Sequence, residues 1–231
     1  MLPFTVCPVG DTGLLVSFEQ RIAQSIGAAV AALNTRVAAA AIPGVVETVP
    51  AFASLLIFYD PLVTEYDAVA AAVQKLAQAP GSDTAAEEGR LVEIPVCYGG
   101  TFGPDLPFVA EHAGLTEKEV IELHAGREYR IYMLGFLPGF PYLGGLDERL
   151  STPRLASPRT AIPAGSVGIG GEQTGVYPIA SPGGWQLIGR TPLKLFDPSA
   201  GRLPYAAGDR IRFCPITQDE FDAIAQKEGT V

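Results

Sequence analysis

The sequence predicts an α+β protein in which a small N-terminal α/β sandwich precedes a β-barrel or β-sandwich. Three observations support this prediction. Strand-like and helix-like segments alternate over residues 4–78, and residues 79–89 are a short run of small and acidic residues. Residues 135–209 combine roughly one Gly or Pro in three with strand-sized apolar segments. We therefore expect an N-terminal domain over residues 1–78, a linker over 79–89 and a second domain over 90–231.

The N-terminal domain is predicted to follow the order ββαββα. Strand-like segments at 4–9 and 14–18 flank the turn signal Gly10-Asp11-Thr12-Gly13, and an Ala-rich helix follows over 21–40. A second strand pair is expected at 45–49 and 54–59. Thr64 and Asp67 are interpreted as the capping box of a helix that reaches residue 78. Both helices are expected to cover one face of the sheet.

The second domain is predicted to begin with a strand at 91–98 and two short helices near 106–112 and 117–124. Thr116 with Glu119, and Thr217 with Glu220, have the spacing of capping boxes, the latter opening a C-terminal helix over 217–227. Short strands are expected between these helices, bounded by glycine and proline turns. They are predicted at 166–169, 176–179, 186–188, 193–196 and, as the closing strand, 210–213.

Composition favours a cytoplasmic protein that binds neither nucleic acid nor membrane. The net charge is −9, and no Lys/Arg cluster offers the basic surface that a nucleic acid or an anionic membrane requires. No segment reaches the roughly 18 consecutive apolar residues of a membrane span, and the N-terminus lacks the features of a secretory signal. The three cysteines are odd in number and far apart, which favours reduced thiols over disulfides.

Several common chemistries have no motif in this chain. There is no GxxxxGK[ST] phosphate loop, and Gln173 occupies the position where a dinucleotide fingerprint needs its third glycine. The segment 164–168 lacks the first glycine of a GxSxG nucleophile elbow. His112 and His124 lack zinc-site spacing, so no metal site is expected. Both lie near helix ends, and we interpret them as cations that interact with helix dipoles.

The segment 129–198 contains the best candidates for a functional surface. Glycines permit close backbone approach and prolines stiffen loops, so the aromatic loop with Phe136, Phe140 and Tyr142 suits a preorganised binding surface, although barrel corners use the same residue types. Arginine forks recognise carboxylates and phosphates, and a glycine-flanked turn offers further donors. These polar candidates are Arg154, Arg159, Glu172, Gln173, Thr174, Arg190 and Thr191. Any single arginine could instead be a structural tie to a carboxylate.

The same segment resembles a known family. The strings GFLPGFPYLGGLD (135–147), TPR (152–154), PRT (158–160), PAGSVGIGGEQTGVYP (163–178), SPGGW (181–185) and IGRTPLKLFDP (188–198) are similar to the carboxyltransferase C/D family. GDTGLLVSF (10–18) resembles the family's first turn, which more often reads GDTALL, and YGG (98–100) with GPDL (103–106) also matches. Members include the B subunit of 5-oxoprolinase, Kip-type inhibitors of a sporulation histidine kinase, and part of the carboxyltransferase domain of urea carboxylases.

The resemblance implies a fold and an activity. It implies a small α/β domain followed by a cyclophilin-like β-barrel, and work as the B subunit, together with subunits A and C, of an ATP-dependent amidohydrolase that opens 5-oxoproline to glutamate. The chain would be inactive alone, and ATP would bind with or through its partners. We assign the catalytic role to Arg159 and Arg190 and expect a composite site at the interface with the C subunit. Two alternatives remain open: a Kip-type inhibitor that binds a histidine kinase, and part of a urea-type carboxyltransferase.

Overall fold

The computed structural model describes residues 2–79, 89–199, 201 and 203–229. The chain divides into two compact units, residues 1–88 and 89–231. Almost all of the linker predicted at 79–89 lies outside the described residues. Among the described helices, none combines the length and the hydropathy that crossing a bilayer requires. The two units are described separately below.

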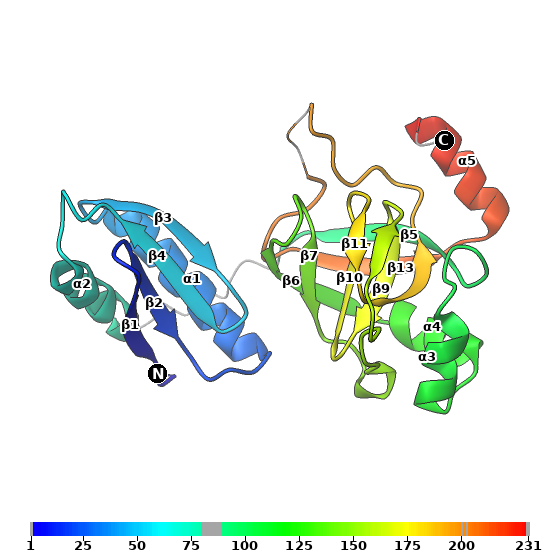
Figure 1. Cartoon of the computed structure of the whole chain (residues 1–231), viewed down its shortest axis with the longest axis horizontal. Helices are drawn as coiled ribbons and strands as arrows, with labels where there is room; N and C mark the ends of the chain where they lie inside the picture. Colours follow the sequence, from blue (N-terminus) through cyan, green and yellow to red (C-terminus); the bar gives the residue numbers. More distant parts are fainter. Residues whose placement is uncertain (1, 80–88, 200, 202, 230–231) are drawn as a thin grey trace. The chain divides into compact units, whose positions relative to one another are not determined.

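The N-terminal unit is a four-stranded antiparallel sheet with two helices on one face. Its sheet order is β1-β2-β4-β3, and Figure 1 shows α1 running behind the strands. The alternate residues Leu14, Val16, Leu55 and Ile57 are fully buried, and they form one hydrophobic core with α1 and α2. The elements are β1 (Thr5–Val9), β2 (Gly13–Ser17), α1 (Gln24–Ala40), β3 (Val45–Pro50), β4 (Ser54–Tyr59) and α2 (Tyr66–Gln78).

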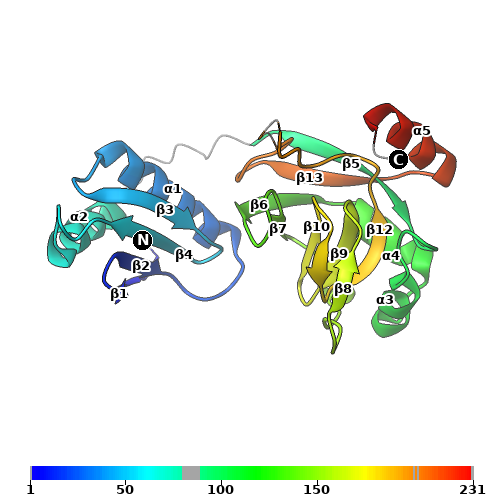
Figure 2. The same ribbon diagram turned by 45° about the horizontal axis from the view of Figure 1, so that its top comes forward.

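The second unit is a closed barrel with the strand order β10-β7-β6-β13-β5-β12-β9. Helices α3 and α4 pack on each other, and α5 lies beside β5 (Figures 1 and 2). The barrel strands are β5 (Leu91–Tyr98), β6 (Glu128–Leu134), β7 (Pro141–Gly144), β9 (Ser166–Gly170), β10 (Gln173–Val176), β12 (Gln186–Arg190) and β13 (Arg210–Pro215). Strands β8 (Arg159–Ile162) and β11 (Ser181–Gly183) form a separate pair. The remaining elements are α3 (Leu106–Ala113), α4 (Glu117–Ala125), η1 (Glu148–Leu150) and α5 (Gln218–Glu228).

The predicted α+β class and the barrel are confirmed, as are both capping boxes of the second unit. Thr116 and Glu119 exchange the two reciprocal hydrogen bonds of a capping box, and Thr217 and Glu220 do the same. Because each box satisfies amide groups that a helix start leaves unpaired, it fixes where α4 and α5 begin.

The capping box predicted for Thr64 is wrong. Helix α2 begins at Tyr66, its N-cap is Glu65, and no side chain caps it. Thr64 instead belongs to the preceding turn, where its amide donates to the Asp60 carbonyl. Its methyl group packs so closely on Gly44 that a Cβ there would lie 2.5 Å away. Thr64 therefore precedes the N-cap by one residue and does not cap the helix.

Two predicted strands also need correction. The strand expected at 176–179 is displaced to Gln173–Val176, because Pro178 has no amide hydrogen with which to extend the ladder. Residues 193–196 form no strand, although Leu195 is buried. The amide of Leu193 donates to Thr191 Oγ1 rather than to a neighbouring strand. Apolar content alone did not distinguish this buried loop from a strand.

Candidate binding site

The hairpin of β9 and β10 has two different faces. Val167, Ile169 and Val176 point into the barrel core, whereas the alternate residues Gly168 and Gly170 lie on the outer face. A Cβ placed on Gly170 would lie 2.5 Å from the indole of Trp185. Gly168 and Gly170 therefore leave the backbone of β9 bare on this face, so that the only tryptophan of the chain can lie directly on it.

An aromatic cluster covers this glycine surface. Trp185 packs edge-to-face against Phe140 with ring centroids 5.5 Å apart, and Phe140 contacts Tyr177 and Tyr142 at 5.2 Å each. Trp185, Phe140 and Tyr177 are buried, and Tyr142 is half-buried. Such edge-to-face contacts add roughly 0.5–1.5 kcal/mol each beyond the area they bury. The cluster is thus a rigid platform built on the outside of the barrel.

Two of the predicted arginines lie at this platform. The guanidinium group of Arg154 lies 5.7 Å from the centroid of the Trp185 ring, in a cation–π contact. Arg159, at the start of β8, donates to Asp105 Oδ1 at 2.7 Å and to the Trp185 carbonyl at 3.5 Å. Both arginines keep part of the side chain exposed, so their remaining donors can reach a ligand.

Asp105 holds Arg159 in place. Its second carboxylate oxygen accepts the Leu187 amide at 2.6 Å, so one carboxylate joins the N-cap of α3, strand β12 and the guanidinium group of Arg159. The Asp105 side chain is 13% exposed and that of Arg159 31% exposed. Because an ion pair of this burial is only partly screened, we interpret Asp105 as the residue that orients Arg159.

The positive charges of Arg154 and Arg159 also affect the pKa of Tyr177. Burial raises the pKa of the Tyr177 hydroxyl, and it outweighs a backbone hydrogen bond at Trp185 and the nearby charges of Arg154 and Arg159, which all lower that pKa. Tyr177 therefore remains a neutral hydroxyl at neutral pH. The platform presents positive charge over an apolar aromatic surface, which suits an anion with a compact apolar body.

Arg190 and Thr191 lie at the opposite end of β12. Arg190 lies four positions after Gln186 in β12, a rise of about 13 Å at 3.3 Å per residue. Arg190 Nε donates to the Ala164 carbonyl at 2.9 Å, and among the described residues no carboxylate contacts its guanidinium group. Thr191 is buried, and its hydroxyl accepts the Leu193 amide. The structure therefore does not bring Arg190 together with Arg154 and Arg159 around Trp185.

The Glu172–Thr174 segment is not a single turn, as the sequence predicted. Glu172 is exposed in the turn between β9 and β10, but Gln173 and Thr174 belong to strand β10 because they pair with Gly170 and Ile169. Thr174 is fully buried, and its hydroxyl donates to the Gly168 carbonyl at 3.0 Å. The Thr174 hydroxyl is therefore used inside the barrel, and only Glu172 and Gln173 reach the surface.

The interpretation of His124 as a cation at a helix end is wrong. Its ring is fully buried, Nδ1 lies 2.8 Å from the Tyr98 hydroxyl, and Nε2 lies 2.8 Å from Thr174 Oγ1. Because Thr174 donates its single hydrogen to Gly168, it must accept from Nε2–H, and Nδ1 accepts from Tyr98. Burial lowers the pKa of His124 to about 3, so the ring is neutral. His112 is exposed and stacks against Phe108.

The predicted aromatic loop divides into an anchor and an exposed tip. Phe140 is buried in the platform, and Tyr205 donates its hydroxyl to the Gly139 carbonyl at 2.9 Å. Phe136 is 64% exposed and has a φ of +63°, a left-handed conformation that costs a bulky residue roughly 1–2 kcal/mol. An exposed aromatic side chain in a strained backbone conformation is a feature of binding surfaces.

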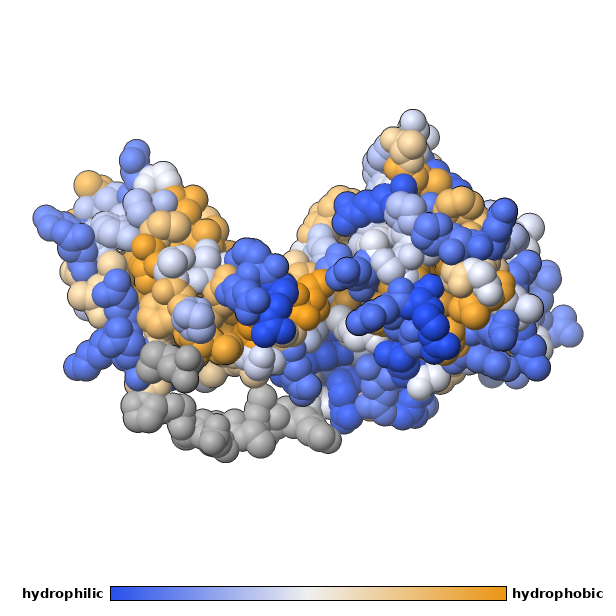
Figure 3. Space-filling view, turned by 90° about the horizontal axis from the view of Figure 1, so that it is seen from below, coloured by the Kyte–Doolittle hydropathy of each residue, from blue (hydrophilic) through white to orange (hydrophobic). Residues whose placement is uncertain are grey.

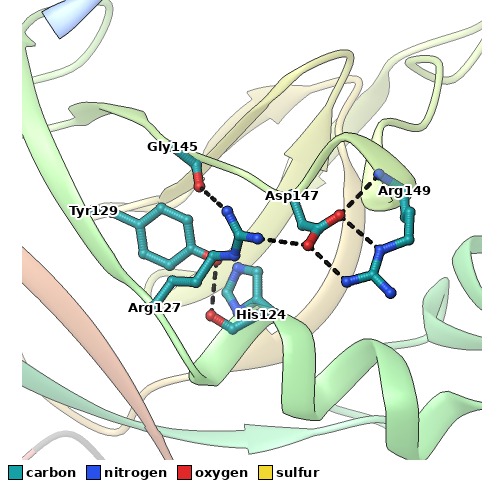
Figure 4. Close-up of polar contacts among 6 residues, drawn as sticks. All are labelled: His124, Arg127, Tyr129, Gly145, Asp147 and Arg149. Carbon is teal, nitrogen blue, oxygen red and sulfur yellow. Dashed lines mark hydrogen bonds and ion pairs between the residues drawn. The ribbon is translucent and has the colours of Figure 1, made fainter.

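A second polar cluster centres on Asp147, at the start of η1 (Figure 4). Its carboxylate accepts from Arg127 at 2.6 Å and from two nitrogens of Arg149 at 2.9 and 2.8 Å. The hydrogen bonds from Arg149 hold the pKa of Asp147 well below its usual range. Arg127 also donates to the Gly145 carbonyl. The cluster connects the residue before β6 and the residue after β7 with η1, and we interpret it as a structural tie.

The arrangement of Arg154 and Arg159 on the aromatic platform suits the recognition of an anion. The described residues contain no group of three or more His, Cys, Asp or Glu side chains that could hold a metal ion. The sequence interpretation missed Asp105, although it quoted GPDL, because nothing in the chain order indicates that residues 105 and 159 are neighbours. It also named Trp185 only as the last residue of the string SPGGW, whereas the glycines of β9 form the surface on which the indole packs.

Residues 4–205 match the family described as carboxyltransferase domain, subdomain C and D, and the chain belongs to this family. It is 43% identical over 232 residues to the B subunit of 5-oxoprolinase from Bacillus subtilis strain 168, with 96% of each chain covered. It is 46% identical over 224 residues to the corresponding protein of Escherichia coli O157:H7, which has the same name, with 96% of this chain and 95% of the relative covered. These comparisons confirm the family predicted from the motifs.

Solved structures agree with the fold. A conserved uncharacterized protein of Pyrococcus horikoshii is 46% identical, with a TM-score of 0.56 and coverage of 94% of this chain and all of that one. The urea carboxylase of Kluyveromyces lactis aligns with a TM-score of 0.82 over 97% of this chain but only 23% of its own. Its identity is 22%, so it indicates a shared fold alone.

Proposed function

We propose that this chain is the B subunit of an ATP-dependent 5-oxoprolinase, which hydrolyses 5-oxo-L-proline to L-glutamate together with subunits A and C. The observation that carries the proposal is the end-to-end relation to two curated 5-oxoprolinase B subunits, with 96% of this chain covered in both cases. A relation limited to one unit would support only a shared domain, whereas this one includes both units.

The reaction explains why ATP and several cationic groups are needed. Opening a five-membered lactam removes amide resonance, and transfer of a phosphoryl group to the carbonyl oxygen would make the carbon a better target for water. Guanidinium groups stabilise the negative charge that develops on such a phosphoryl group. The substrate also has a carboxylate, which an arginine fork can bind through two hydrogen bonds. Arg154 and Arg159 on the aromatic platform suit either role.

The site is proposed to be composite. The chain has no phosphate-binding loop, so ATP would bind with or through subunits A and C. The C subunit would complete the site at the surface formed by Arg154, Arg159 and the tip of the aromatic loop. Arg190 would contribute from the far end of β12, where its guanidinium group is bound only to a backbone carbonyl among the described residues. By itself, the chain would bind the substrate weakly and would not turn it over.

The test is reconstitution with each of the three proteins omitted in turn. ATP hydrolysis and glutamate release from 5-oxoproline would be measured for this chain mixed with subunits A and C. We expect both activities to require all three proteins. Full activity without this chain would overturn the proposal and would favour a binding module, such as a Kip-type inhibitor of a histidine kinase.

A further inference from the structure

The N-terminal sheet has a second face that is also apolar. The strand registers place three rows of residues on this face, and the third row, Thr5, Ser17 and Ser54, is polar. The other two rows, which we call the open face, are Val9, Gly13, Phe58 and Glu47, and next to them Cys7, Leu15, Leu56 and Val49. These residues alternate with the inward-pointing Leu14, Val16, Leu55 and Ile57, so they point away from the helices. Of the seven side chains in these two rows, five are apolar, one is the thiol of Cys7 and one is the carboxylate of Glu47, while Gly13 has none.

Among the described elements of the N-terminal unit, none packs on the open face. Helices α1 and α2 both pack on the opposite side of the sheet, and the unit's hydrophobic core contains none of the residues of the open face. A two-layer antiparallel sheet ordinarily presents polar residues to water on its uncovered side. On the open face, Val9 and Val49 are 42% and 43% exposed. Figure 3 draws one side of the molecule, on which hydrophobic residues gather on the N-terminal unit and hydrophilic residues cover much of the second unit. Contiguous apolar surface of this kind marks a contact site.

The charges at the border of the open face are negative. Glu47 lies within the face, and Asp11 and Asp60 lie in the turns at the same end of the sheet. The three basic residues of the unit lie elsewhere: Arg36 and Lys75 are on the helices of the other side, and Arg21 pairs with Glu19. A partner that covers the open face should therefore have an apolar centre bordered by Lys or Arg.

Size and charge argue against a second copy of this chain. Four strands about 4.8 Å apart and about five residues long form a face of roughly 320 Å², less than half of the ~800 Å² that each partner buries in a standard interface. Two copies would also place their acidic borders against each other, which is unfavourable. The contact therefore needs a different protein that binds the open face and a further surface of the chain.

We propose that the open face is a docking surface for the C subunit, which is the partner that the proposed function requires at the barrel. This inference rests on that proposed function. The partner then binds the chain at two places: the arginine–aromatic surface, where the reaction occurs, and the open face, where it only docks. Binding at the first surface raises the effective concentration for the second, so a face too small to bind alone still contributes to affinity.

Cys7 provides a probe of this contact without any mutation. It is the one exposed cysteine, whereas Cys97 is buried and Cys214 is half-buried. The rate of Cys7 alkylation by N-ethylmaleimide would be followed by mass spectrometry of its peptide. We expect rapid alkylation in the isolated chain and a rate at least about tenfold slower when the C subunit is saturating, because a covered thiol reacts slowly.

Each other outcome overturns the inference. An unchanged rate in a complex with the C subunit means that the open face is not in the interface. If Cys7 of the isolated chain is alkylated slowly at every protein concentration, the chain's own second unit covers the open face. If alkylation becomes slower as the protein concentration rises, a second copy of the chain covers it. Protection of Cys7 when only the A subunit is added would mean that the open face binds the A subunit and not the C subunit. A complete failure to bind the C subunit instead contradicts the proposed function.

Substitutions test the chemistry of the contact. Val49→Lys places a cation in the open face, and Leu62→Lys is its matched control in the exposed turn before α2. We expect Val49→Lys to weaken the binding of the C subunit roughly tenfold and Leu62→Lys to change it less than about twofold. Glu47→Lys should slow association and reduce its salt dependence. Equal affinities of the two lysine variants would overturn the proposal even if both fold normally.

Discussion

The two faces of the β9–β10 hairpin have different roles: the inner face belongs to the barrel core, and the outer face supports the aromatic platform. The inner face is filled by Val167, Ile169 and Val176, and its one polar group, Thr174, is satisfied by His124 and Gly168. The outer face has glycines beneath Trp185, with Arg154 above the indole. The inner network is complete and excludes ligands, whereas the outer surface leaves cationic donors exposed. Function is therefore expected on the outside of this barrel.

Among the substitutions that test stability at neutral pH, the largest effect is expected from a methyl group added beneath Trp185. Gly170→Ala would place Cβ 2.5 Å from the indole, so the ring must move. We expect the free energy of unfolding to fall by about 2 kcal/mol, with a shift in the emission of this single tryptophan. Gly184→Ala is the control, because its Cβ would meet its nearest neighbour at an ordinary 3.6 Å. Equal stability and emission in both variants would contradict the packing of Trp185 on β9.

A pH-dependent effect is expected from the inner face. The pKa of His124 is about 3 in the folded protein and near 6.5 in the unfolded chain, so only the unfolded state gains a proton between these values. The contribution of His124 to the free energy of unfolding is therefore constant above pH 6.5. It falls as the pH decreases toward 3, by up to about 1.4 kcal/mol per pH unit. Urea unfolding of wild type and His124→Gln across this range isolates the contribution of this one ring.

In that experiment, the stability advantage of the wild type over His124→Gln should shrink as pH falls. His112→Gln removes an exposed imidazole and retains His124, so it should keep the steep pH dependence of the wild type. Parallel pH profiles for wild type and His124→Gln would mean that the buried ring is not the neutral histidine described above.

An intermediate effect is expected from the carboxylate that orients Arg159. Asp105→Asn keeps the shape of the side chain but removes its charge, which weakens the 2.7 Å contact with Arg159. We expect kcat/KM of the assembled enzyme for 5-oxoproline to fall about tenfold, mainly through KM, because substrate binding is the step affected. Asp197→Asn removes a carboxylate from an ion pair with Lys194 and should leave kcat/KM unchanged. A loss shared by both variants would indicate general destabilisation.

The smallest effect on the free energy of unfolding is expected from removing Arg154, whose guanidinium group lies over the Trp185 ring. Arg154→Ala removes an exposed cation–π contact, which contributes about 0.5–1 kcal/mol to the free energy of unfolding. Arg154→Lys keeps the charge and should recover part of that loss. Thermal unfolding of the three proteins measures the difference. A loss above about 2 kcal/mol would mean that Arg154 has a structural role that the contact does not account for.

The sequence predicted local features better than contacts between distant segments. The capping boxes at Thr116 and Thr217 depend on a Glu three positions later, so a local pattern identified them, whereas the same spacing with Asp67 forms no box at Thr64. The pairing of Asp105 with Arg159 spans 54 residues and depends on barrel closure, which spacing does not reveal. His124 was misinterpreted for the same reason, because it lies on α4 while its partners Tyr98 and Thr174 come from β5 and β10. The family motifs indicated the activity without indicating which arginines share a surface.

The most direct test of the central claim is the activity of Arg159→Ala in a complex assembled with subunits A and C. The complex should form normally, and kcat/KM for 5-oxoproline-dependent ATP hydrolysis should fall about 100-fold, because a charge-assisted contact of about 3 kcal/mol is lost. Arg159→Lys should recover little, since an ammonium group cannot replace the fork. Arg21→Ala, in an exposed ion pair of the N-terminal unit, is the control. Wild-type activity of Arg159→Ala in an intact complex would contradict the account.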